Sequence, residues 1–479
     1  MTFEELVAQI GAGNTLGVRT DSRLVQRGDV FVAVKGTEFD GHDFIDKALS
    51  SGARYIVCQK YPQPARSDMS YEWITVDDST HAAATLAQEV HGNPASQLTN
   101  LAVTGTNGKT TTAFLVRSCI EQAGHKCGLI GTVIYDTCSG QSYPAPLTTP
   151  DYLEIAAKQQ EMVRNGAKYM VIEASSHALS QNRLAQVDCQ AAAFTNLAGD
   201  HLDYHKTPRE YLAAKTRLFS ALSPDATAVL NRQSPEAEQI ARQTRARLLW
   251  YAIDQQADLA AHVQSMDTSG TVFALRYENQ TSIVRTPLLG AYNVSNCLAA
   301  AGLCLAAGFN LDTIAAGLSA LKAIPGRLEK VEDGDFSIIV DYAHTDDALK
   351  NVLATLKPLC TGKLRVVFGC GGDRDKTKRP RMAKVAEELA DFVIVTSDNP
   401  RTENADDIIR DIVAGFERID TKMIEPDRRR AIELAIASAE PHDIVLLAGK
   451  GHEDYQIIGK QKSHFSDKEI AQECVGRRR

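Results

Sequence analysis

The chain has 479 residues, of which 52 are Lys or Arg and 60 are Asp or Glu, so its formal net charge at pH 7 is −8. This length indicates about three domains, and the acidic balance argues against binding to a nucleic-acid backbone or an anionic membrane. The first residues lack the positive charge of a signal peptide, and no apolar run approaches the roughly 18 residues of a membrane span, so we expect a cytoplasmic protein.

The pattern of apolar residues divides the chain into three parts. Residues 1–97 form a small unit rich in short strands. From residue 98, β-rich runs such as "NLAVTG" and "KYMVIE" alternate with helical runs such as "TTTAFLVRSCIEQAG", which predicts a parallel sheet with crossover helices. Two helices then lead to a Pro-Gly break at 325–326. A second alternating series follows it. We predict an α/β protein with domains at 1–97, 98–324 and 325–479, the last a separate doubly wound sheet.

Polar clusters follow the predicted strands repeatedly. "TGTNGKT" follows "LAV", "EASSH" follows "YMVI", "DYAH" follows "SIIV", "GGDRD" follows "VVFGC", "DNPR" follows "VIVTS", and "GKGHE" follows "IVLLA". In open α/β sheets, ligands bind beyond the carboxyl ends of the strands. We therefore expect the ligand sites in these clusters.

The segment "VTGTNGKTTT" predicts a phosphate site. Gly105 and Gly108 lie in a turn between a strand and a helix, where backbone N–H groups and the helix N-terminus can hold phosphate oxygens. Lys109 would neutralise the phosphates and the Thr110 hydroxyl would bind Mg²⁺. Val103 occupies the place of the first glycine of the full G-x-x-x-x-G-K-[ST] pattern. An ordinary strand–helix turn is therefore the alternative.

Three acidic or imidazole side chains are candidates for a metal site near this loop. Glu173 ends the strand "KYMVIE" and would face the same crevice as Thr110, although a carboxylate there could instead cap a helix. Asp200 and His201 in "GDHLDYH" are weaker candidates, because a lone histidine often has only a structural hydrogen bond.

Motifs along nearly the whole chain resemble, in the expected order, those of the Mur ligases of peptidoglycan synthesis. They are "GTNGKTTT", "EASSHALSQNR", "FTNLAGDHLDYH", "YLAAKTRLF", "GAYNVSN", "PGRLE", "DYAHTDDAL", "FGCGGDRDKTKRP", "DNPRTE" and "AGKGHEDYQ". "GTNGKT" is shared with folylpolyglutamate synthases, whereas "DNPR" is more discriminating. The resemblance implies a uridine-binding first domain, a central ATP-binding domain and a C-terminal amino-acid-binding domain.

The implied reaction is an ATP-driven amide synthesis. The γ-carboxylate of the D-glutamate in UDP-N-acetylmuramoyl-L-Ala-D-Glu is phosphorylated, and the amine of meso-2,6-diaminopimelate attacks the acyl phosphate. Such chemistry needs charge neutralisation more than covalent participation by the protein. The implied cofactors are ATP and Mg²⁺, and the family suggests a monomer. The implied catalytic residues are Lys109, Glu173, His201 and Lys215.

The resemblance also assigns the binding residues. Thr110 and Glu173 would hold one Mg²⁺, and His201 a second one together with Lys215 as a carbamate (N6-carboxylysine); by itself Lys215 would be interpreted as a solvated helix residue. The implied ATP-binding residues are Gly105, Thr106, Asn107, Gly108, Lys109, Thr110, Thr111, Asn293, Asn296, Arg327, Asp341 and His344. The implied contacts to the UDP-substrate are Ser22, Thr148, Thr149, Ser175, Gln181 and Arg183. Outside this context, the hydroxyls among them would be interpreted as turn-making residues.

The motif "DNPR" has a chemical interpretation within the resemblance. The far end of meso-diaminopimelate carries an amino and a carboxyl group, whereas lysine carries only an ammonium. Arg401 can bind the carboxylate with a bidentate fork, an acid nearby can receive the ammonium, and Pro400 stiffens the loop. The alternative is a surface turn in which Arg401 pairs with Glu403 or Asp406. The implied pocket consists of Arg374, Asp398, Asn399, Pro400, Arg401, Gly449 and Glu453.

Three departures from the family pattern and four rival functions remain. Leu147 stands where the family often has asparagine, Asp346 where it usually has proline, and residues 231–236 lack the common aspartates.

The rivals are a lysine-adding ligase, a D-alanyl-D-alanine-adding ligase, a folylpolyglutamate-type ligase, and a P-loop switch in which hydrolysis drives partner binding. "DNPR" argues against the first and the N-terminal domain against the third.

Overall fold

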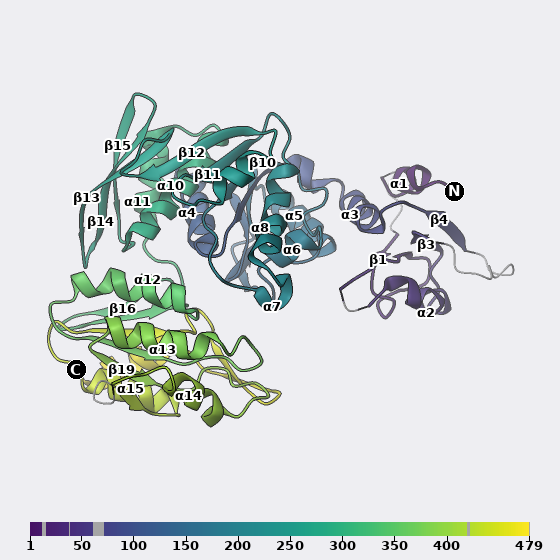
Figure 1. The fold of residues 1–479 in the computed structure, drawn as a ribbon. Helices are drawn as coiled ribbons and strands as arrows, with labels where there is room; N and C mark the ends of the chain where they lie inside the picture. The colour runs from purple at the N-terminus through teal and green to yellow at the C-terminus, as the bar shows by residue number, and fades with distance from the viewer. Residues whose placement is uncertain (12–15, 38, 61–70, 419–421, 479) are drawn as a thin grey trace.

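The computed structural model describes residues 1–11, 16–37, 39–60, 71–418 and 422–478. The chain forms three bodies with separate sheets, and the first and last of them lie on different sides of the central one (Figure 1). The predicted three-domain α/β fold is confirmed. Within the described ranges, no helix is long and apolar enough to cross a membrane.

The first body contains a four-stranded, all-parallel sheet in the order β1-β2-β3-β4. Its helix α3 begins after Asp78, whose carboxylate accepts hydrogen bonds from two backbone N–H groups of the first turn. The elements are α1 (Phe3–Gly11), β1 (Val18–Arg19), β2 (Val30–Val32), η1 (Gly41–Phe44), α2 (Ile45–Ser50), β3 (Tyr55–Cys58), β4 (Glu72–Thr75), α3 (Ser79–Val90) and η2 (Pro94–Gln97).

The central body contains an eleven-stranded mixed sheet in the order β15-β14-β13-β12-β11-β10-β5-β9-β6-β7-β8. Its first elements are β5 (Thr99–Thr104), α4 (Lys109–Gln122), β6 (Cys127–Ile130), β7 (Ile134–Asp136), β8 (Ser142–Pro144), α5 (Tyr152–Arg164), β9 (Tyr169–Glu173), α6 (Ser176–Ser180), β10 (Cys189–Phe194), α7 (Leu202–His205) and α8 (Pro208–Ser220). The others are β11 (Thr227–Asn231), α9 (Ala237–Ala241), β12 (Arg247–Ile253), β13 (Leu259–Asp267), β14 (Gly270–Tyr277), β15 (Gln280–Thr286), α10 (Ala291–Ala306) and α11 (Leu311–Ala320).

This sheet is parallel, as predicted, from β13 to β6, and antiparallel strands extend it at both ends. The hairpins β13-β14-β15 and β6-β7-β8 form these extensions, which the alternation of strands and helices does not predict. Helices α4, α10 and α11 bury their apolar side chains with one face of the sheet, and α5, α6 and α8 with the other. The first body is joined here, because α3 packs on α5 and Gln88 Nε2 donates to Gln159 Oε1 at 2.8 Å.

The C-terminal body contains a six-stranded sheet in the order β16-β17-β21-β18-β19-β20, parallel except for β16. Helices α12 to α14 cover one face and α15 and α16 the other, so the prediction of a doubly wound sheet is confirmed. The elements are β16 (Glu329–Asp333), β17 (Ser337–Asp341), α12 (Asp346–Leu356), η3 (Lys357–Leu359), β18 (Leu364–Phe368), α13 (Lys378–Leu389), β19 (Phe392–Val395), α14 (Ala405–Val413), β20 (Lys422–Ile424), α15 (Arg428–Ala437), β21 (Ile444–Ala448), β22 (Tyr455–Ile458), β23 (Gln461–His464) and α16 (Asp467–Arg478).

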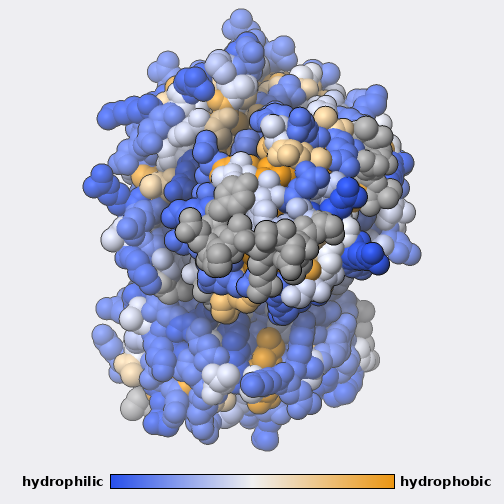
Figure 2. Space-filling model, turned by 90° about the vertical axis from the view of Figure 1, so that its right-hand side faces the viewer, coloured by the Kyte–Doolittle hydropathy of each residue, from blue (hydrophilic) through white to orange (hydrophobic). Residues whose placement is uncertain are grey.

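The predicted polar clusters follow the carboxyl ends of β5, β9, β17, β18, β19 and β21. The hairpin β22-β23, which the sequence pattern does not indicate, lies next to them, because Arg401 forms a bridge with Ile458. We propose domain boundaries at 97/98 and 324/325, each of which falls between two elements. Figure 2 shows a largely hydrophilic face on which hydrophobic residues occur in small groups, with the C-terminal body set off below.

Candidate functional site

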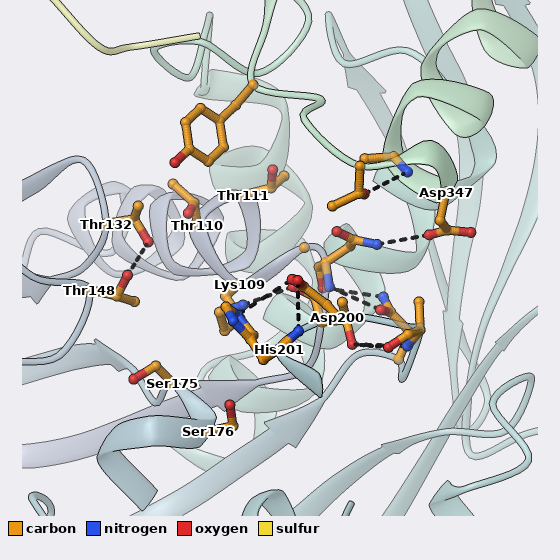
Figure 3. A pocket seen from close by; sticks show the side chains of 18 of the residues that line it. Lys109, Thr110, Thr111, Thr132, Thr148, Ser175, Ser176, Asp200, His201 and Asp347 are labelled. Carbon is orange, nitrogen blue, oxygen red and sulfur yellow. Dashed lines mark hydrogen bonds and ion pairs between the residues drawn. The ribbon is translucent and has the colours of Figure 1, made fainter. Parts of the chain in front are cut away.

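A cavity of about 780 Å³ lies between the central and the C-terminal bodies. The loop after β5 and the first turn of α4 form one wall, and residues of the segment after β17 form another. In the close view of Figure 3, Lys109, Asp200 and His201 lie together, Thr132 and Thr148 lie to one side of them, and Asp347 lies to the other. The cavity therefore borders the carboxyl edges of two sheets, as the position of the polar clusters predicts.

The loop after β5 has the tight packing that a phosphate site needs. Gly105 and Gly108 have φ angles of 151° and 88°, which other residues rarely adopt. A Cβ atom on Gly105 would lie 1.9 Å from Thr195 Oγ1, and one on Gly108 would lie 2.2 Å from Asn296 Oδ1. Both glycines are therefore required by the close approach of neighbouring segments. The helix α4 begins directly after them, so the unpaired N–H groups of its first turn lie at the cavity.

Lys109 folds back over this loop. Its Nζ donates hydrogen bonds to the carbonyl oxygens of Gly105 at 3.0 Å and Thr106 at 2.9 Å. Burial lowers the pKa of Lys109 below its ordinary value, whereas the negative charges of Glu173 and Asp200 favour the protonated form. The ammonium is thus held at the mouth of the predicted phosphate site by weak acceptors that an anion can replace.

Glu173 is fully buried behind Thr110, at the end of β9. Its carboxylate accepts hydrogen bonds from the Thr110 hydroxyl at 3.0 Å, the Thr132 hydroxyl at 2.8 Å and the Thr132 N–H at 2.8 Å. The alternative role as a helix cap is not observed, because Ser175 caps α6. In the described part of the chain, no group of three His, Cys, Asp or Glu side chains could hold a metal ion. The oxygen donors of Thr110 and Glu173 suit Mg²⁺, which usually takes its remaining ligands from phosphates and water.

Lys215 is buried, with 1% of its surface exposed, so the interpretation as a solvated helix residue is wrong. Its Nζ donates to the Gly105 carbonyl oxygen at 2.9 Å and lies 4.3 Å from the centre of the Tyr211 ring. Burial lowers the pKa of Lys215 far below its ordinary value, and the nearby charge of Lys109 acts in the same direction. An amine that loses its proton easily is a nucleophile, which is what carbamate formation with CO₂ requires.

His201 lies in the same corner of the cavity, with a left-handed backbone at φ 54°. Its Nε2 is 3.4 Å from Asp200 Oδ2, and its ring meets that of His177 edge to face at a centroid distance of 4.9 Å. Burial lowers the pKa of His201 to about 4. The imidazole is therefore neutral at pH 7, the form that can bind a metal ion. The roles of Lys215 and His201 in metal binding stay predictions.

The predicted nucleotide-side residues of α10 and the C-terminal body also line the cavity. Asn296 Nδ2 donates to Asn293 Oδ1 at 3.1 Å, and Arg327 Nη2 donates to Thr110 Oγ1 at 3.3 Å. The carboxylate of Asp341 accepts hydrogen bonds from the Leu328 N–H and from the Ala343 N–H, and the second bond holds the backbone next to His344. The residues of this set in the cavity wall are Thr106, Asn107, Gly108, Lys109, Thr110, Thr111, Asn293, Asn296, Arg327, Asp341 and His344.

The sequence reasoning missed two residues at this cavity: Asp347, which joins the two bodies, and Tyr342, which packs on Arg327 within the C-terminal body. Asn107 Nδ2 donates to Asp347 Oδ2 at 3.0 Å, and the guanidinium of Arg327 lies 4.7 Å from the centre of the Tyr342 ring. Both Tyr342 and Asp347 belong to the quoted motif "DYAHTDDAL". Their position next to His344 was the available signal.

The predicted contacts to the UDP-substrate divide between two bodies. Thr149 Oγ1 donates to the Glu173 carbonyl oxygen at 2.6 Å, and Arg183 Nη1 donates to the Thr149 carbonyl oxygen at 2.7 Å. Ser22 is buried in the first body and is outside the described cavity lining. The residues of this set that line the cavity are Thr148, Thr149, Ser175, Gln181 and Arg183.

Most residues of the predicted amino-acid pocket lie beyond the carboxyl ends of β19 and β21, whereas Arg374 follows β18. Asn399 Nδ2 donates to Glu453 Oε2 at 2.9 Å. Gly449 has a φ of 113°, and a Cβ atom there would lie 2.8 Å from Asp398 Oδ2. Arg374 lines the cavity described above, whereas Asp398, Asn399, Pro400, Arg401, Gly449 and Glu453 are not part of its described lining. The structure thus separates Arg374, at the nucleotide-side cavity, from the other predicted residues of this pocket.

Arg401 has a left-handed backbone at φ 52°, and its Nη1 donates to the Gly372 carbonyl oxygen at 2.7 Å. The alternative pairing with Glu403 is not observed, because Glu403 is held by the buried guanidinium of Arg379 at 2.9 Å and by Lys376 at 3.1 Å. The hydrogen bond from Arg379 lowers the pKa of Glu403 to about 2. Since other cations bind this carboxylate, Arg401 stays available for a ligand.

The structure shows the surroundings of two of the three residues or segments that depart from the family pattern, Asp346 and Leu147. Asp346, in the place of a family proline, accepts a hydrogen bond from Arg381 Nε at 3.0 Å and so ties α12 to α13. Leu147 is half exposed in the cavity wall, and its carbonyl oxygen accepts a hydrogen bond from the Tyr135 hydroxyl. An apolar side chain there cannot make the hydrogen bond of an asparagine.

Three family sequence models match the chain. They are described as "Mur ligase family, catalytic domain" over residues 15–91, "Mur ligase middle domain" over residues 103–304, and "Mur ligase, glutamate ligase domain" over residues 326–451. Each match falls within one of the three bodies.

Similar proteins cover nearly the whole chain. The UDP-N-acetylmuramoyl-L-alanyl-D-glutamate–2,6-diaminopimelate ligase of Geobacillus kaustophilus is 43% identical over 476 residues, which are 98% of this chain and 96% of that protein. The ligase of the same name from Gloeobacter violaceus is 42% identical over 488 residues, covering 100% and 99%. A solved structure of such a ligase has a TM-score of 0.70 at 33% identity, covering 96% and 95%. The MurF ligase of Thermotoga maritima in complex with ADP has a TM-score of 0.64 at 20% identity, covering 97% and 99%, and is alike in fold.

Proposed function

Because the chain belongs to the Mur ligase family, we propose that it is an ATP-dependent ligase that adds meso-2,6-diaminopimelate to UDP-N-acetylmuramoyl-L-alanyl-D-glutamate in peptidoglycan synthesis. The observation that carries the proposal is the group beyond β19 and β21. There Arg401, whose Nη1 donates to the Gly372 carbonyl oxygen, follows the buried Asn399 closely in the chain, and Asn399 donates to Glu453. The names of relatives at 43% and 42% identity support the same reaction.

The chemistry begins with transfer of the ATP γ-phosphoryl group to the γ-carboxylate of D-glutamate, which releases ADP. The amine of the acceptor then attacks the acyl carbon, the C–O bond to phosphate breaks, and phosphate and a proton leave. Lys109 and the N–H groups at the start of α4 would bind the transferring phosphoryl group. Thr110 and Glu173 would hold Mg²⁺, which when bound supplies positive charge to the phosphate oxygens.

Lys215 would act as a carbamate in this scheme. Its burial, its lowered pKa and its place beside Lys109 and His201 support this assignment. We expect a carbamate carbon signal in ¹³C NMR spectra of the enzyme equilibrated with ¹³C-bicarbonate. The signal should be absent from Lys215→Met, and its persistence in that variant would assign it to another amine. A wild-type spectrum without the signal would contradict the assignment.

The acceptor pocket would recognise the far end of diaminopimelate as a zwitterion. Arg401 would bind the carboxylate, and Asp398 and Glu453 would receive the ammonium. Most of these residues lie outside the cavity lining, so the two bodies would have to close during the reaction. We further propose that the enzyme acts as a monomer in the cytoplasm, where its soluble substrates occur.

The decisive assay compares phosphate release with ATP, Mg²⁺ and UDP-N-acetylmuramoyl-L-Ala-D-Glu in the presence of meso-diaminopimelate, L-lysine or no amino acid. We expect kcat/KM for diaminopimelate to be about 10⁴ times that for lysine, because lysine leaves the Arg401 guanidinium without a counter-ion. Equal phosphate release in all three reactions would contradict the proposal and favour a P-loop switch.

A further inference from the structure

Lys450 is a fully buried lysine that the sequence analysis left without a role. It lies just after β21 in "AGKGHE", separated from the strand by Gly449, and none of its side chain is exposed. A charged ammonium is unfavourable in a protein interior unless acceptors and counter-ions surround it. The partners of Lys450 are therefore informative about what this position does.

These partners include residues of the predicted acceptor pocket. Lys450 Nζ donates to Asn399 Oδ1 at 3.2 Å, and it lies 3.9 Å from Asp398 Oδ1 and 3.8 Å from Glu453 Oε2. A further hydrogen bond, to the Tyr455 carbonyl oxygen at 2.6 Å, anchors the ammonium to the hairpin β22-β23. One buried cation thus contacts three acceptor-pocket side chains.

The contact to Asn399 determines the orientation of its amide. Asn399 Oδ1 accepts from Lys450 Nζ and from the Ile457 N–H at 3.0 Å, so both neighbours on that side are donors. Only the oxygen of an amide can face two donors. The amide Nδ2 must then face Glu453 Oε2, at 2.9 Å. Without Lys450, the preference for this orientation would be weaker.

Lys450 also determines the charge of the pocket. Asp398 and Glu453 formally carry two negative charges, of which the Lys450 ammonium balances one. Burial lowers the pKa of Lys450, whereas the charges of these two carboxylates favour its protonated form. The nearby guanidinium of Arg428 is neutralised by Asp467, with which it forms a fully buried ion pair at 2.6 Å. One negative charge remains, which matches the single ammonium at the far end of the proposed acceptor. Burial and Asp398 raise the pKa of Glu453, whereas the charge of Lys450 opposes that change.

We propose that Lys450 is a positioning residue for the acceptor amino acid, which orients the Asn399 amide and leaves the pocket with one net negative charge for the ammonium. This inference rests on the proposed function. It assigns Lys450 no contact with ATP, with the UDP-substrate or with the reacting atoms. Replacing Lys450 should therefore weaken the use of the acceptor amino acid and leave the use of ATP and of the UDP-substrate unchanged.

The test compares steady-state constants of the full-length enzyme and its Lys450→Met variant for all three substrates. We expect the KM for meso-diaminopimelate to rise at least about tenfold, because a misoriented amide and an unbalanced second carboxylate both weaken acceptor binding. The KM values for ATP and for UDP-N-acetylmuramoyl-L-Ala-D-Glu should stay within about twofold. Lys460→Met, at an exposed position in the turn between β22 and β23, is the matched control and should behave like the wild type.

An unchanged KM for diaminopimelate, or an equal rise in all three constants, would overturn the inference. If Lys450→Met does not fold, as judged by its thermal unfolding and ATP binding, the same comparison on Lys450→Gln decides, since glutamine keeps a donor without the charge. A wild-type enzyme that does not use diaminopimelate would instead refute the proposed function. The two failures are thus distinguishable.

Discussion

Replacing Lys109 with methionine will lower kcat by about 10³-fold. The Lys109 ammonium lies at the start of α4, where it can stabilise the negative charge of the phosphoryl group during its transfer. Methionine keeps the length and apolar stem of the side chain, so the buried position stays filled. Phosphate release under saturating substrates measures the effect.

The appropriate control for this change is Lys168→Met, at an exposed position of the same body, which should keep the wild-type kcat. Thermal unfolding should show that both variants are folded. A Lys109→Met enzyme with a kcat within tenfold of the wild type would contradict the phosphate assignment of the loop. A variant with intact kcat and a raised KM for ATP would mean that Lys109 binds ground state and transition state equally.

Replacing Arg401 with alanine will lower kcat/KM for meso-diaminopimelate by about 10² to 10³-fold, the usual effect of removing one partner from a buried, hydrogen-bonded charge pair. The KM for ATP should stay within about twofold, because Arg401 lies outside the described cavity lining. The rate with L-lysine should change little, so the preference for diaminopimelate should fall from about 10⁴-fold to about 10- to 100-fold.

Arg401→Lys separates charge from geometry at this position. Lysine restores the positive charge but not the planar fork, so we expect a loss about tenfold smaller than that of alanine. The left-handed backbone at φ 52° strains both variants alike, which makes their difference a property of the side chain. Arg410→Ala, on the exposed side of α14, is the control. A collapse of nucleotide affinity in either Arg401 variant would contradict the pocket assignment.

Much of the fold could be predicted from local patterns. The alternation of strands and helices predicted the parallel part of the central sheet and the doubly wound C-terminal sheet, because side-chain periodicity reports which faces of an element are buried. The same alternation says nothing about β13-β14-β15 or about β22-β23, which extend or accompany sheets that are already complete. Their pairing depends on contacts between strands, which a local pattern does not contain.

The candidate site was predictable where a motif carries its own geometry. Gly105, Gly108 and Lys109 belong to one turn, so their neighbourhood follows from the chain itself. The resemblance supplied the residues of the acceptor pocket, but not Lys450, which holds three of them together. Lys450 belongs to the quoted motif "AGKGHEDYQ", but its role could not be predicted from it, because a lysine after a strand is normally solvated.

The sequence by itself determined the three-part α/β organisation, the phosphate loop and the edges of the sheets at which the ligands must bind. Only the tertiary structure decided the states of its charged residues. It buried Lys215 against the loop after β5, engaged Glu403 with Arg379, and enclosed Lys450 among acceptors. The physical reason is that burial and neighbouring charges determine whether a side chain is neutral, paired or available, and these depend on segments that are distant in the chain.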